Sequence, residues 1–536
     1  MKLLPAARMR ALDERAIKEI GIPGVVLMEE AGRGAARMIS AAGWLPDSDA
    51  PVVLLAGKGN NGGDALVVAR ILWLVGYRNL AVGLLGTRER VSGDARINLE
   101  IFLKLGGKVV EITDEDAWER AGLLAGPPAL VVDGLLGTGL HSEVRGLYAR
   151  VIAEVNAFAG PILALDIPSG LDADSGRVLG AAVKATATAT FAFGKPGLYL
   201  WPGREYAGQI EIIDIGIPRE WAAAEIDSVE LLTKTGISRY LPPRPGPGVH
   251  KGNRGHLLLF AGRPGFTGAG LLAAGAGLYA GCGLATLALP AAAAAQIEGC
   301  NPALMLKYLS ADRYGGVIAP PPAEFESLLA GKQALVIGPG FGLREGATLL
   351  LAKLLCRFAG PMVLDADALT LLAQEPEELL PPDPERLILT PHPGEMARLL
   401  GCTSRQVQSD RLAAARELAR RWRVHLVLKG AGTIIVDPDG RTAINNSGNQ
   451  LLATAGAGDI LSGIIGAFLA RGAAPGAAAR AGVFLHGHLA DRLAAVGRNA
   501  GITAVELQRE LPAALAEWEG NGVAISSKGL ADSIYD

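Results

Sequence analysis

Short uninterrupted runs of apolar residues alternate with helix-compatible segments along most of the chain. Apolar runs of this kind are typical of strands that are covered on both faces of a parallel sheet. In the first half the predicted strands are 51–56, 80–85, 108–112, 129–132, 161–165, 186–193 and 212–217. In the second half they are 256–261, 334–337, 362–364, 387–389 and 426–428. Because helical segments separate these strands, we expect an α/β fold in both halves, with a doubly wound parallel sheet in the first.

The length of the chain, 536 residues, is too great for a single hydrophobic core, so at least two domains are expected. Residues 1–43 are predicted to be helical with a break at 22–24, and two further helices are predicted at 65–75 and 95–105. Residues 218–227 are predicted to form a connecting helix or loop. We expect a first domain at 1–220, a linker at 221–227, a second domain at 228–515 and a C-terminal tail at 516–536.

Polar motifs follow three predicted strands of the first half, at 60–64, 133–139 and 166–170. In doubly wound sheets ligands bind beyond the carboxyl ends of the strands, so these motifs predict a binding site there. Residues 57–62 formally fit the pattern G-x-G-x-x-G. The second strand, however, ends in Gly86-Thr87-Arg88 without the acidic residue that would hold a ribose, which argues against an NAD-dependent dehydrogenase.

Polar motifs also follow the strands of the second half, and one of them leads into a strongly apolar helix. Small residues from Ala455 to Gly458 precede Asp459, and the helix-compatible run 460–469 follows. Such a turn points backbone N–H groups and the positive end of the helix dipole at one spot, which attracts anions. Asp459 could then take a proton from an attacking hydroxyl in phosphoryl transfer. The alternative is that Asp459 only caps the helix.

Composition and charge exclude several classes of protein. Half of the residues are hydrophobic, a fifth are charged, and the net charge is −3 without a basic stripe, so we do not expect a nucleic-acid partner. The four cysteines lie far apart without C-x-x-C spacing, which indicates neither a disulfide framework nor a zinc site and suits a reducing cytosol. Polar residues interrupt any apolar core of a signal peptide near the N-terminus, namely Pro5, Arg8, Arg10 and Asp13. We therefore expect a cytoplasmic protein.

One long stretch, 264–297, contains no charged residue, and its length alone would permit a membrane-spanning helix. Its many glycines and the break near Pro290 argue against one. We instead expect a buried helix with a glycine face at 268–281, followed by a buried strand, and no membrane association.

The three polar motifs of the first half resemble those of the NAD(P)H-hydrate epimerase family. Asn-Asn-Gly-Gly-Asp, Asp-x-x-x-Gly-Thr-Gly and Asp-Ile-Pro-Ser-Gly-Leu-Asp occur in the family's order, and the segments 9–13 and 27–32 are similar as well. The resemblance covers roughly residues 5–218 and implies a Rossmann-like three-layer sandwich. One departure is Ala65, where the family commonly has glycine.

The resemblance implies an epimerase site built from these motifs. The implied hydrate-binding residues are Asn60, Asn61, Gly62, Gly63, Asp64, Gly137, Thr138, Gly139, Leu140, His141, Ser142, Glu143 and Asp166. Potassium would be held by Asn61, Asp133 and Ser169, whose oxygen atoms suit a hard cation. Turn capping is the alternative role for Asp133 and Ser169.

Two residues are candidates for acid–base work in the first half. Asp166, at a strand end, is the candidate for proton transfer around C6 of the hydrate. Lys195 is expected near the same edge of the sheet, either as an auxiliary acid or base or as a phosphate contact. The alternative for Lys195 is an ordinary solvated lysine.

The second half resembles the ADP/ATP-dependent NAD(P)H-hydrate dehydratase family over about residues 228–510. The resemblance implies a ribokinase-like fold, a hydrate bound by Ala269, Gly340, His392 and Asp459, and a nucleotide bound by Lys429, Gly430, Ala431, Gly432, Thr433 and Gly458. Ala457 stands where the family usually has threonine, so one possible hydroxyl contact is missing. His392 lies in a rigid turn between two prolines, which favours a ligand contact, although a lone histidine more often has a purely structural role. A metal-ligand role is excluded because no second His or Cys lies at ligand spacing.

Both halves in this order resemble the bifunctional NAD(P)H-hydrate repair enzymes of bacteria. The expected substrates are hydrated NADH and NADPH with ADP or ATP as co-substrate, K⁺ in the epimerase domain, Mg²⁺ in the dehydratase domain, and a homo-oligomeric assembly. Phosphorylation of the C6 hydroxyl, with Asp459 as base, would turn it into a leaving group that the ring nitrogen can expel; the amides of residues 456–459 and Mg²⁺ would balance charge. Two alternatives stay open, namely a ribokinase-like kinase for a vitamin alcohol and a non-catalytic binding role for the first domain.

Overall fold

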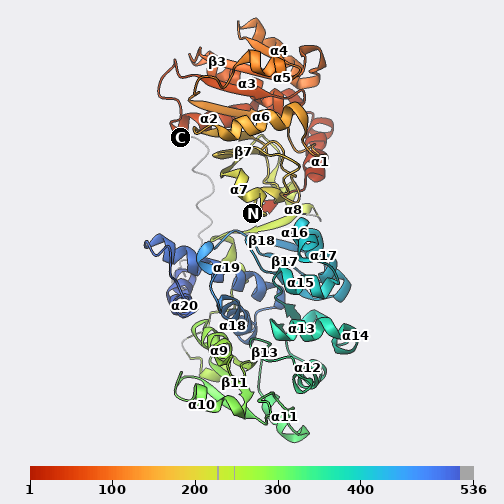
Figure 1. The fold of residues 1–536 in the computed structure, drawn as a ribbon, viewed down its shortest axis with the longest axis vertical. Helices are drawn as coiled ribbons and strands as arrows, with labels where there is room; N and C mark the ends of the chain where they lie inside the picture. The colour runs from red at the N-terminus through yellow and green to blue at the C-terminus, as the bar shows by residue number, and fades with distance from the viewer. Residues whose placement is uncertain (226–227, 245, 247, 520–536) are drawn as a thin grey trace. The chain divides into compact units, whose positions relative to one another are not determined.

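The computed structural model describes residues 1–225, 228–244, 246 and 248–519 (Figure 1). The chain divides into two compact units, Met1–Leu231 and Leu232–Asp536. The predicted domain limits at 220 and 228 lie close to this division and stay predictions. Of the predicted tail, residues 516–519 belong to the last helix, and residues 520–536 lie outside the described residues.

The first unit is built on a seven-stranded sheet in the order β4-β3-β2-β5-β6-β7-β8, in which every neighbouring pair is parallel. The strands are β2 (Val52–Ala56), β3 (Leu80–Leu85), β4 (Val109–Ile112), β5 (Leu130–Gly134), β6 (Ile162–Leu165), β7 (Ala187–Phe191) and β8 (Gln209–Ile213). The strand order reverses between β2 and β5, which is the place where ligands bind in such sheets. A short β1 (Lys2–Leu3) pairs antiparallel with β9 (Val229–Leu232).

Helices cover both faces of this sheet because successive residues of each strand point to opposite sides. Val52 and Leu54 belong to the core that also contains residues of α2, α3 and α4, whereas Val53 and Leu55 belong to the core that contains residues of α5 and α6. The expected three-layer sandwich is therefore confirmed. The helices are α1 (Ala6–Arg15), α2 (Gly24–Ala42), α3 (Asn60–Leu74), α4 (Gly93–Lys104), α5 (Glu115–Ala121), α6 (Gly146–Ala157), α7 (Gly203–Ala207) and α8 (Arg219–Ala224).

Two predicted boundaries in this unit are wrong. The last strand was expected at 212–217 but occupies Gln209–Ile213. This strand lies at the edge of the sheet, so Gln209 and Glu211 are exposed and its start does not form a continuous apolar run. Helix α3 begins at Asn60 rather than at Ala65. The Asn60–Asp64 motif therefore forms the first turn of a helix instead of a loop.

The second unit contains a mixed sheet in the order β18-β17-β16-β15-β14-β13-β10-β11-β12. Strands β10 to β16 pair in parallel, and β17 and β18 pair antiparallel. The strands are β10 (His256–Phe260), β11 (Leu284–Pro290), β12 (Met305–Leu309), β13 (Ala334–Ile337), β14 (Met362–Leu364), β15 (Leu387–Leu389), β16 (His425–Leu428), β17 (Ile434–Val436) and β18 (Thr442–Asn445). The sequence pattern missed β12, β17 and β18.

Helices connect most of the strands of this unit. They are α9 (Thr267–Tyr279), α11 (Pro322–Leu329), α12 (Glu345–Arg357), α13 (Asp367–Gln374), α15 (Pro393–Leu400), α17 (Arg411–Trp422), α18 (Ala457–Ala470), α19 (Pro475–Ala495) and α20 (Ala504–Glu519), with shorter α10 (Ala294–Ile297), α14 (Pro376–Leu379) and α16 (Ser404–Ser409).

Helices α9 and α18 lie side by side in the core of the second unit (Figure 1). Glycine permits this close approach, since a Cβ at Gly463 would lie only 2.1 Å from the carbonyl oxygen of Ala273. The predicted glycine-faced buried helix is thus confirmed as α9, and the strand β11 follows it. Within the described residues, no helix has both the length and the apolar character needed to cross a membrane.

Candidate active sites

A cavity of about 520 Å³ lies beyond the carboxyl ends of β2, β5, β6 and β7 in the first unit. Its lining includes eight of the residues that the sequence placed in the first site, Asn60, Asn61, Asp64, Gly137, Thr138, Gly139, Leu140 and Asp166, together with the acid–base candidate Lys195. These residues come from three strand ends that are far apart in sequence. The fold therefore brings the three motifs together, as the parallel sheet predicted.

Five of the predicted hydrate-binding residues are not part of this lining, namely Gly62, Gly63, His141, Ser142 and Glu143. The two glycines have a packing role instead. A Cβ at Gly62 would lie 1.9 Å from the carbonyl oxygen of Gly57, and a Cβ at Gly63 would lie 2.7 Å from Met28. Any larger residue would push α3 away from the strand end and from Met28.

The side chains of Asp166 and Lys195 form a buried ion pair in this cavity. Lys195 is only 1% exposed and also donates hydrogen bonds to Thr190 Oγ1 and to the carbonyl of Phe191, both at 3.0 Å. The alternative of a solvated lysine is therefore wrong. Asp166 has a φ of 61°, which is rare for a residue with a side chain, and its Oδ1 accepts a hydrogen bond from the N–H of Phe191.

Three further aspartates line the same cavity, Asp13, Asp64 and Asp94. Burial raises the pKa of Asp13 to about 6, against an opposing effect of Lys195. Burial also raises the pKa of Asp64 well above its usual value, and the charge of Asp166 adds to the effect. Asp13 belongs to the segment 9–13 that resembles the epimerase family, but the resemblance implied no role for it. The cavity therefore contains a buried ion pair and, among its other carboxyl groups, two whose pKa values are raised by burial.

The three residues expected to bind potassium lie around the loop that follows β5. Ser169 Oγ donates to Asp133 Oδ1 at 2.6 Å, and Leu136 N–H donates to Ser169 Oγ at 2.8 Å. Asn61 Nδ2 donates to the carbonyl of Leu136 at 3.0 Å, while its buried Oδ1 has no hydrogen-bond partner within the described chain. Burial raises the pKa of Asp133 to about 6, against opposing hydrogen bonds from Ser169. An unpartnered buried oxygen beside a buried carboxyl is what a bound cation would satisfy.

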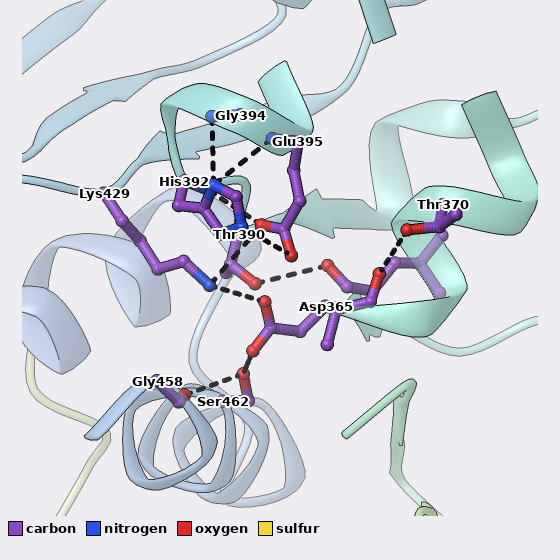
Figure 2. Close-up of polar contacts among 11 residues, drawn as sticks. Asp365, Thr370, Thr390, His392, Gly394, Glu395, Lys429, Gly458 and Ser462 are labelled. Atoms are coloured by element: carbon purple, nitrogen blue, oxygen red, sulfur yellow. Dashed lines mark hydrogen bonds and ion pairs between the residues drawn. The ribbon is translucent and has the colours of Figure 1, made fainter. Parts of the chain in front are cut away.

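A network of charged side chains joins three strand ends in the second unit (Figure 2). Lys429 Nζ donates to Asp365 Oδ1 at 2.7 Å, and Ser462 Oγ of α18 donates to Asp365 Oδ2 at 2.7 Å. Glu395 Oε2 lies 3.9 Å from Lys429 Nζ. Burial by itself lowers the pKa of Lys429, but the carboxylates of Asp365 and Glu395 outweigh it and raise that pKa. Asp365, Glu395 and Ser462 received no role from the sequence, although the first two stand in motifs that end predicted strands.

Asp459 lies in the first turn of α18, next to this network. The helix starts after Gly456, which has a φ of 89° and serves as the N-cap, and no side chain caps the helix. Asp459 is therefore not a capping residue. Burial, followed by the charge of Asp365, raises the pKa of Asp459 to about 7. A carboxyl group with a pKa near neutrality is well matched to general-base work.

His392 caps α15 with its imidazole ring. Its Nδ1 accepts hydrogen bonds from the N–H groups of Gly394 at 2.9 Å and Glu395 at 3.3 Å, and Glu395 Oε2 in return accepts from the N–H of His392. Because Nδ1 accepts, the neutral ring carries its proton on Nε2. His392 thus has a structural role as the cap of α15. Its side chain is half exposed, so Nε2–H can donate to a ligand or to Glu395.

The two remaining hydrate candidates, Ala269 and Gly340, adjoin each other. A Cβ at Gly340 would lie 3.4 Å from that of Ala269, and Gly340 has a φ of 61° that favours glycine. The start of α9 also touches the start of α18, since a Cβ at Gly456 would lie 2.5 Å from Leu272. The first turns of α9 and α18, which contain Ala269 and Asp459, and the loop that contains Gly340 thus meet at one edge of the sheet.

Arg411 contacts the backbone of the predicted nucleotide loop, Lys429–Thr433, and no sequence motif predicted a role for it. Arg411 is buried at the start of α17 and donates to the carbonyls of Leu428 and Lys429, both at 3.2 Å, and of Ala431. In a trans peptide the N–H points opposite to the C=O, so the amides of Gly430 and Gly432 point away from Arg411. Gly458 lies nearby, because a Cβ there would be 3.6 Å from Lys429 Nζ.

Comparison with known proteins identifies the family. A family model described as NAD(P)H-hydrate dehydratase matches residues 257–513, and a model described as YjeF-related protein N-terminus matches residues 24–197. The bifunctional NAD(P)H-hydrate repair enzyme Nnr of Moorella thermoacetica is 42% identical over 531 residues, which are 99% of this chain and 99% of that protein. The chain belongs to the bifunctional NAD(P)H-hydrate repair enzyme family.

A second curated relative agrees with this membership. The repair enzyme Nnr of Escherichia coli K12 is 36% identical over 503 residues, which cover 93% of this chain and 91% of that protein. The crystal structure of an ADP/ATP-dependent NAD(P)H-hydrate dehydratase from Bacillus subtilis with ATP/Mg²⁺ is 27% identical and covers 54% of this chain and 99% of its own, with a TM-score of 0.44. Membership of the repair-enzyme family confirms the resemblance seen in both halves, and the mixed sheet with its covering helices confirms the α/β class of the second. It favours repair over the vitamin-kinase alternative.

Proposed function

We propose that the two sites divide the repair of hydrated NADH and NADPH between them. The first domain interconverts the R and S hydrates, and the second dehydrates the S form to NAD(P)H at the expense of ADP or ATP, giving AMP or ADP and phosphate. The single observation that supports this most strongly is the 42% identity to a bifunctional repair enzyme over 99% of both chains. The residues assigned to the two reactions lie beyond the carboxyl ends of strands in each unit.

In the second domain, the proposal assigns proton removal to Asp459. Its carboxylate takes the proton of the C6 hydroxyl while the oxygen attacks the terminal phosphorus of the nucleotide. The ring nitrogen lone pair then expels phosphate from C6, and loss of a C5 proton restores the dihydropyridine. Hydroxide is a poor leaving group and phosphate a good one, so the nucleotide supplies the driving force. Lys429 and the amides of Gly430 and Gly432 would hold the nucleotide phosphates.

Magnesium remains part of the proposal for this domain. Among the described residues there is no group of three or more His, Cys, Asp or Glu side chains placed to hold a metal ion. Mg²⁺ in nucleotide sites is commonly held by one or two carboxylates together with phosphates and water, and the carboxylates of Asp365 and Glu395 fit that description. When bound, the ion would neutralise charge on the transferring phosphoryl group.

In the first domain, the proposal assigns proton transfer around C6 to Asp166, with Lys195 as its fixed partner. The ion pair with Lys195 fixes the position of the Asp166 carboxylate in the cavity. The carboxylate takes the proton of the C6 hydroxyl as the C6–N1 bond opens to an aldehyde and N1 takes up a proton; closure of N1 on the other face of the aldehyde returns both protons and gives the other epimer. Asp133, Asn61 and Ser169 fit a potassium ion, whose charge would hold the hydrate's oxygen atoms in place.

A phosphate-release assay tests the proposed function. The purified chain is mixed with hydrated NADH and with ADP or ATP, and both NADH absorbance and free phosphate are followed. Repair predicts equal amounts of NADH and phosphate with at least one of the nucleotides. A stable phosphorylated product without NADH would instead support a kinase.

The cellular site and the assembly also belong to the proposal. A cytoplasmic location follows from the need to meet free NADH hydrates and ADP, and fractionation of cells tests it. A homo-oligomer is expected, and light scattering during size-exclusion chromatography measures it.

A further inference from the structure

Three arginines with aromatic partners lie on loops beyond the carboxyl ends of β10, β12 and β13. The Arg263 guanidinium lies 3.9 Å from the ring centroid of Phe266. Those of Arg313 and Arg344 lie 4.6 Å and 4.4 Å from the ring centroid of Tyr314. We call these five residues the arginine–aromatic cluster. No role has been given to any of them so far.

The three loops pack into one surface. A Cβ at Gly342 would lie 3.2 Å from Cδ of Arg263, so the loop after β13 touches the loop after β10. A Cβ at Gly316 would lie 2.9 Å from Cδ of Arg344, and one at Gly315 would lie 3.1 Å from Pro264. The loop after β12 therefore touches both of the others.

This surface is exposed and positively charged. The rings of Phe266 and Tyr314 are 53% and 60% exposed. Within the described chain, none of the three arginines forms an ion pair. Two carboxyl groups contact these loops. Asp312 Oδ1 accepts hydrogen bonds from the N–H groups of Tyr314 at 2.7 Å and Gly316 at 2.8 Å, and Asp367 Oδ2 accepts one from the N–H of Gly342 at 2.7 Å. Three guanidinium groups beside two carboxylates leave a net positive charge, which favours anions.

The cluster is continuous with the hydrate site. The carbonyl oxygen of Phe266 would lie 2.8 Å from a Cβ at Gly340, and Gly340 adjoins Ala269. Along the sheet edge, the strand order runs from Lys429 at β16 through Asp365 at β14 to the cluster at β13, β10 and β12. Neighbouring strands are about 4.8 Å apart, so the edge from β14 to β12 spans roughly 20 Å. The nucleotide loop and the cluster thus lie on opposite sides of the hydrate candidates.

We propose that the arginine–aromatic cluster binds the phosphates of the dinucleotide substrate, both the pyrophosphate and the extra phosphate of the NADPH form. This inference rests on the proposed function, which makes the substrate a hydrated dinucleotide. Such a substrate has its reacting ring at one end, its adenosine at the other and its phosphates away from the ring. With the ring at Ala269 and Asp459, and ADP at Lys429–Thr433, the free direction along the edge leads to the cluster. Guanidinium groups match phosphate oxygens in a bidentate way, and the aromatic rings hold them in position beforehand.

The test compares substrates with and without phosphates in the full-length enzyme. Arg263→Gln, Arg313→Gln and Arg344→Gln variants, and the triple variant, are assayed for dehydration of hydrated NADH, hydrated NADPH and hydrated reduced nicotinamide riboside, which lacks every phosphate. Each single variant should raise KM for the dinucleotides about three- to tenfold, as loss of one exposed charge-assisted contact does, with kcat unchanged. KM for the riboside and for ADP should not change.

Arg357→Gln is the matched control. Arg357 is exposed at the far end of α12, the helix that begins just after Arg344, and it pairs with Glu326. It carries the same charge but lies about 20 Å along the helix from the cluster. Its kinetics should match those of the wild type. The wild-type KM for hydrated NADPH should also rise with salt more steeply than that of the triple variant.

Three results would overturn the proposal. The first is an unchanged dinucleotide KM in the triple variant. The second is an equal rise for the riboside, which would show a general structural defect. The third is a rise in KM for ADP alone, which would assign the cluster to the co-substrate. Calorimetric titration with NADPH gives an answer that needs no turnover, because the triple variant should lose affinity and Arg357→Gln should keep it. If the wild type binds NADPH but does not dehydrate the hydrates, the proposed function fails while the binding result still decides the inference.

Discussion

The ammonium group of Lys429 donates a hydrogen bond to Asp365 Oδ1 at 2.7 Å, across 64 residues of sequence. The two residues follow β16 and β14, with β15 between them in the sheet. Their pair also holds Ser462 of α18 through Asp365 Oδ2. Besides burial, the charge of Asp365 raises the pKa of Asp459 and that of Lys429 lowers it, so this pair affects the pKa of the proposed base.

Asp459→Asn should separate the two activities. The substitution keeps the shape of the side chain but removes the base, which typically costs 10²- to 10⁴-fold in rate. With an epimeric mixture of hydrated NADH, nucleotide and Mg²⁺, recovery of NADH absorbance should nearly stop, while chromatography should still show interconversion of the epimers. Asp166→Ala should do the reverse, leaving a fast phase for one epimer and a slow one for the other. Near wild-type recovery by Asp459→Asn would show that Asp459 is not the base.

Dehydration should depend on pH in the way that the Asp459 pKa of about 7 requires. The base acts only when it is unprotonated, so kcat/KM for hydrated NADH should fall about tenfold for each pH unit below that pKa. A pH–rate profile from pH 5.5 to 8.5 measures this. A profile that stays flat down to pH 5.5 would contradict the assignment.

Asp459 should also lower the stability of the second domain as the pH rises. Its pKa in the folded protein, about 7, is above the usual 3.8, so the folded state binds the proton more tightly than the unfolded chain does. Stability is therefore greatest below pH 4 with respect to this group and is lost as the pH rises through 7. Asparagine does not titrate, so Asp459→Asn should gain Tm relative to the wild type between pH 5 and pH 8. Parallel Tm curves for both proteins would exclude this linkage.

Potassium should accelerate epimerisation more than dehydration. The unpartnered Oδ1 of Asn61 and the buried carboxyl of Asp133 would be satisfied by the ion. Replacing potassium by sodium should slow exchange between the epimers, with a smaller effect on NADH recovery from the S epimer alone. Asn61→Leu should remove the difference between the two salts. Equal epimerase rates in potassium, sodium and ion-free buffer would contradict the proposed potassium site.

Arg411→Lys should weaken nucleotide binding without affecting the hydrate. Lysine keeps the charge but cannot hold the carbonyls of Leu428, Lys429 and Ala431 together, so the amides of the nucleotide loop should lose their common direction. We expect KM for ADP to rise about tenfold, as loss of two hydrogen bonds to a charged donor would give, with KM for hydrated NADH unchanged. Arg420→Lys, on the same helix but exposed, is the control. A proportional loss for both substrates would indicate general unfolding instead.

The sequence by itself determined the α/β class, nearly every parallel strand and the strand ends at which the chemistry lies. It could do so because a buried parallel strand has to be apolar on both faces, and because polar residues directly after such a strand have few other uses. The motifs with small residues, 60–64 and 455–459, were visible for the same reason. The edge strand β8 was misplaced because its exposed Gln209 and Glu211 interrupt the apolar run. Strands β12, β17 and β18 were missed; β12 is mostly only half-buried, and β17 and β18 are short strands that pair antiparallel.

Only the tertiary structure decided which charged groups meet. The sequence left Lys195 open between a role in the site and an ordinary solvated lysine, and the structure shows that it is 1% exposed and paired with Asp166. Arg411 lies in a helix pattern without any motif, and its partners are backbone carbonyls, which carry no signature in the sequence. The same holds for the pKa of Asp459, which depends on burial and on Asp365 at another strand end. Electrostatic energies depend on distance and desolvation, and both exist only once the sheet has brought remote segments together.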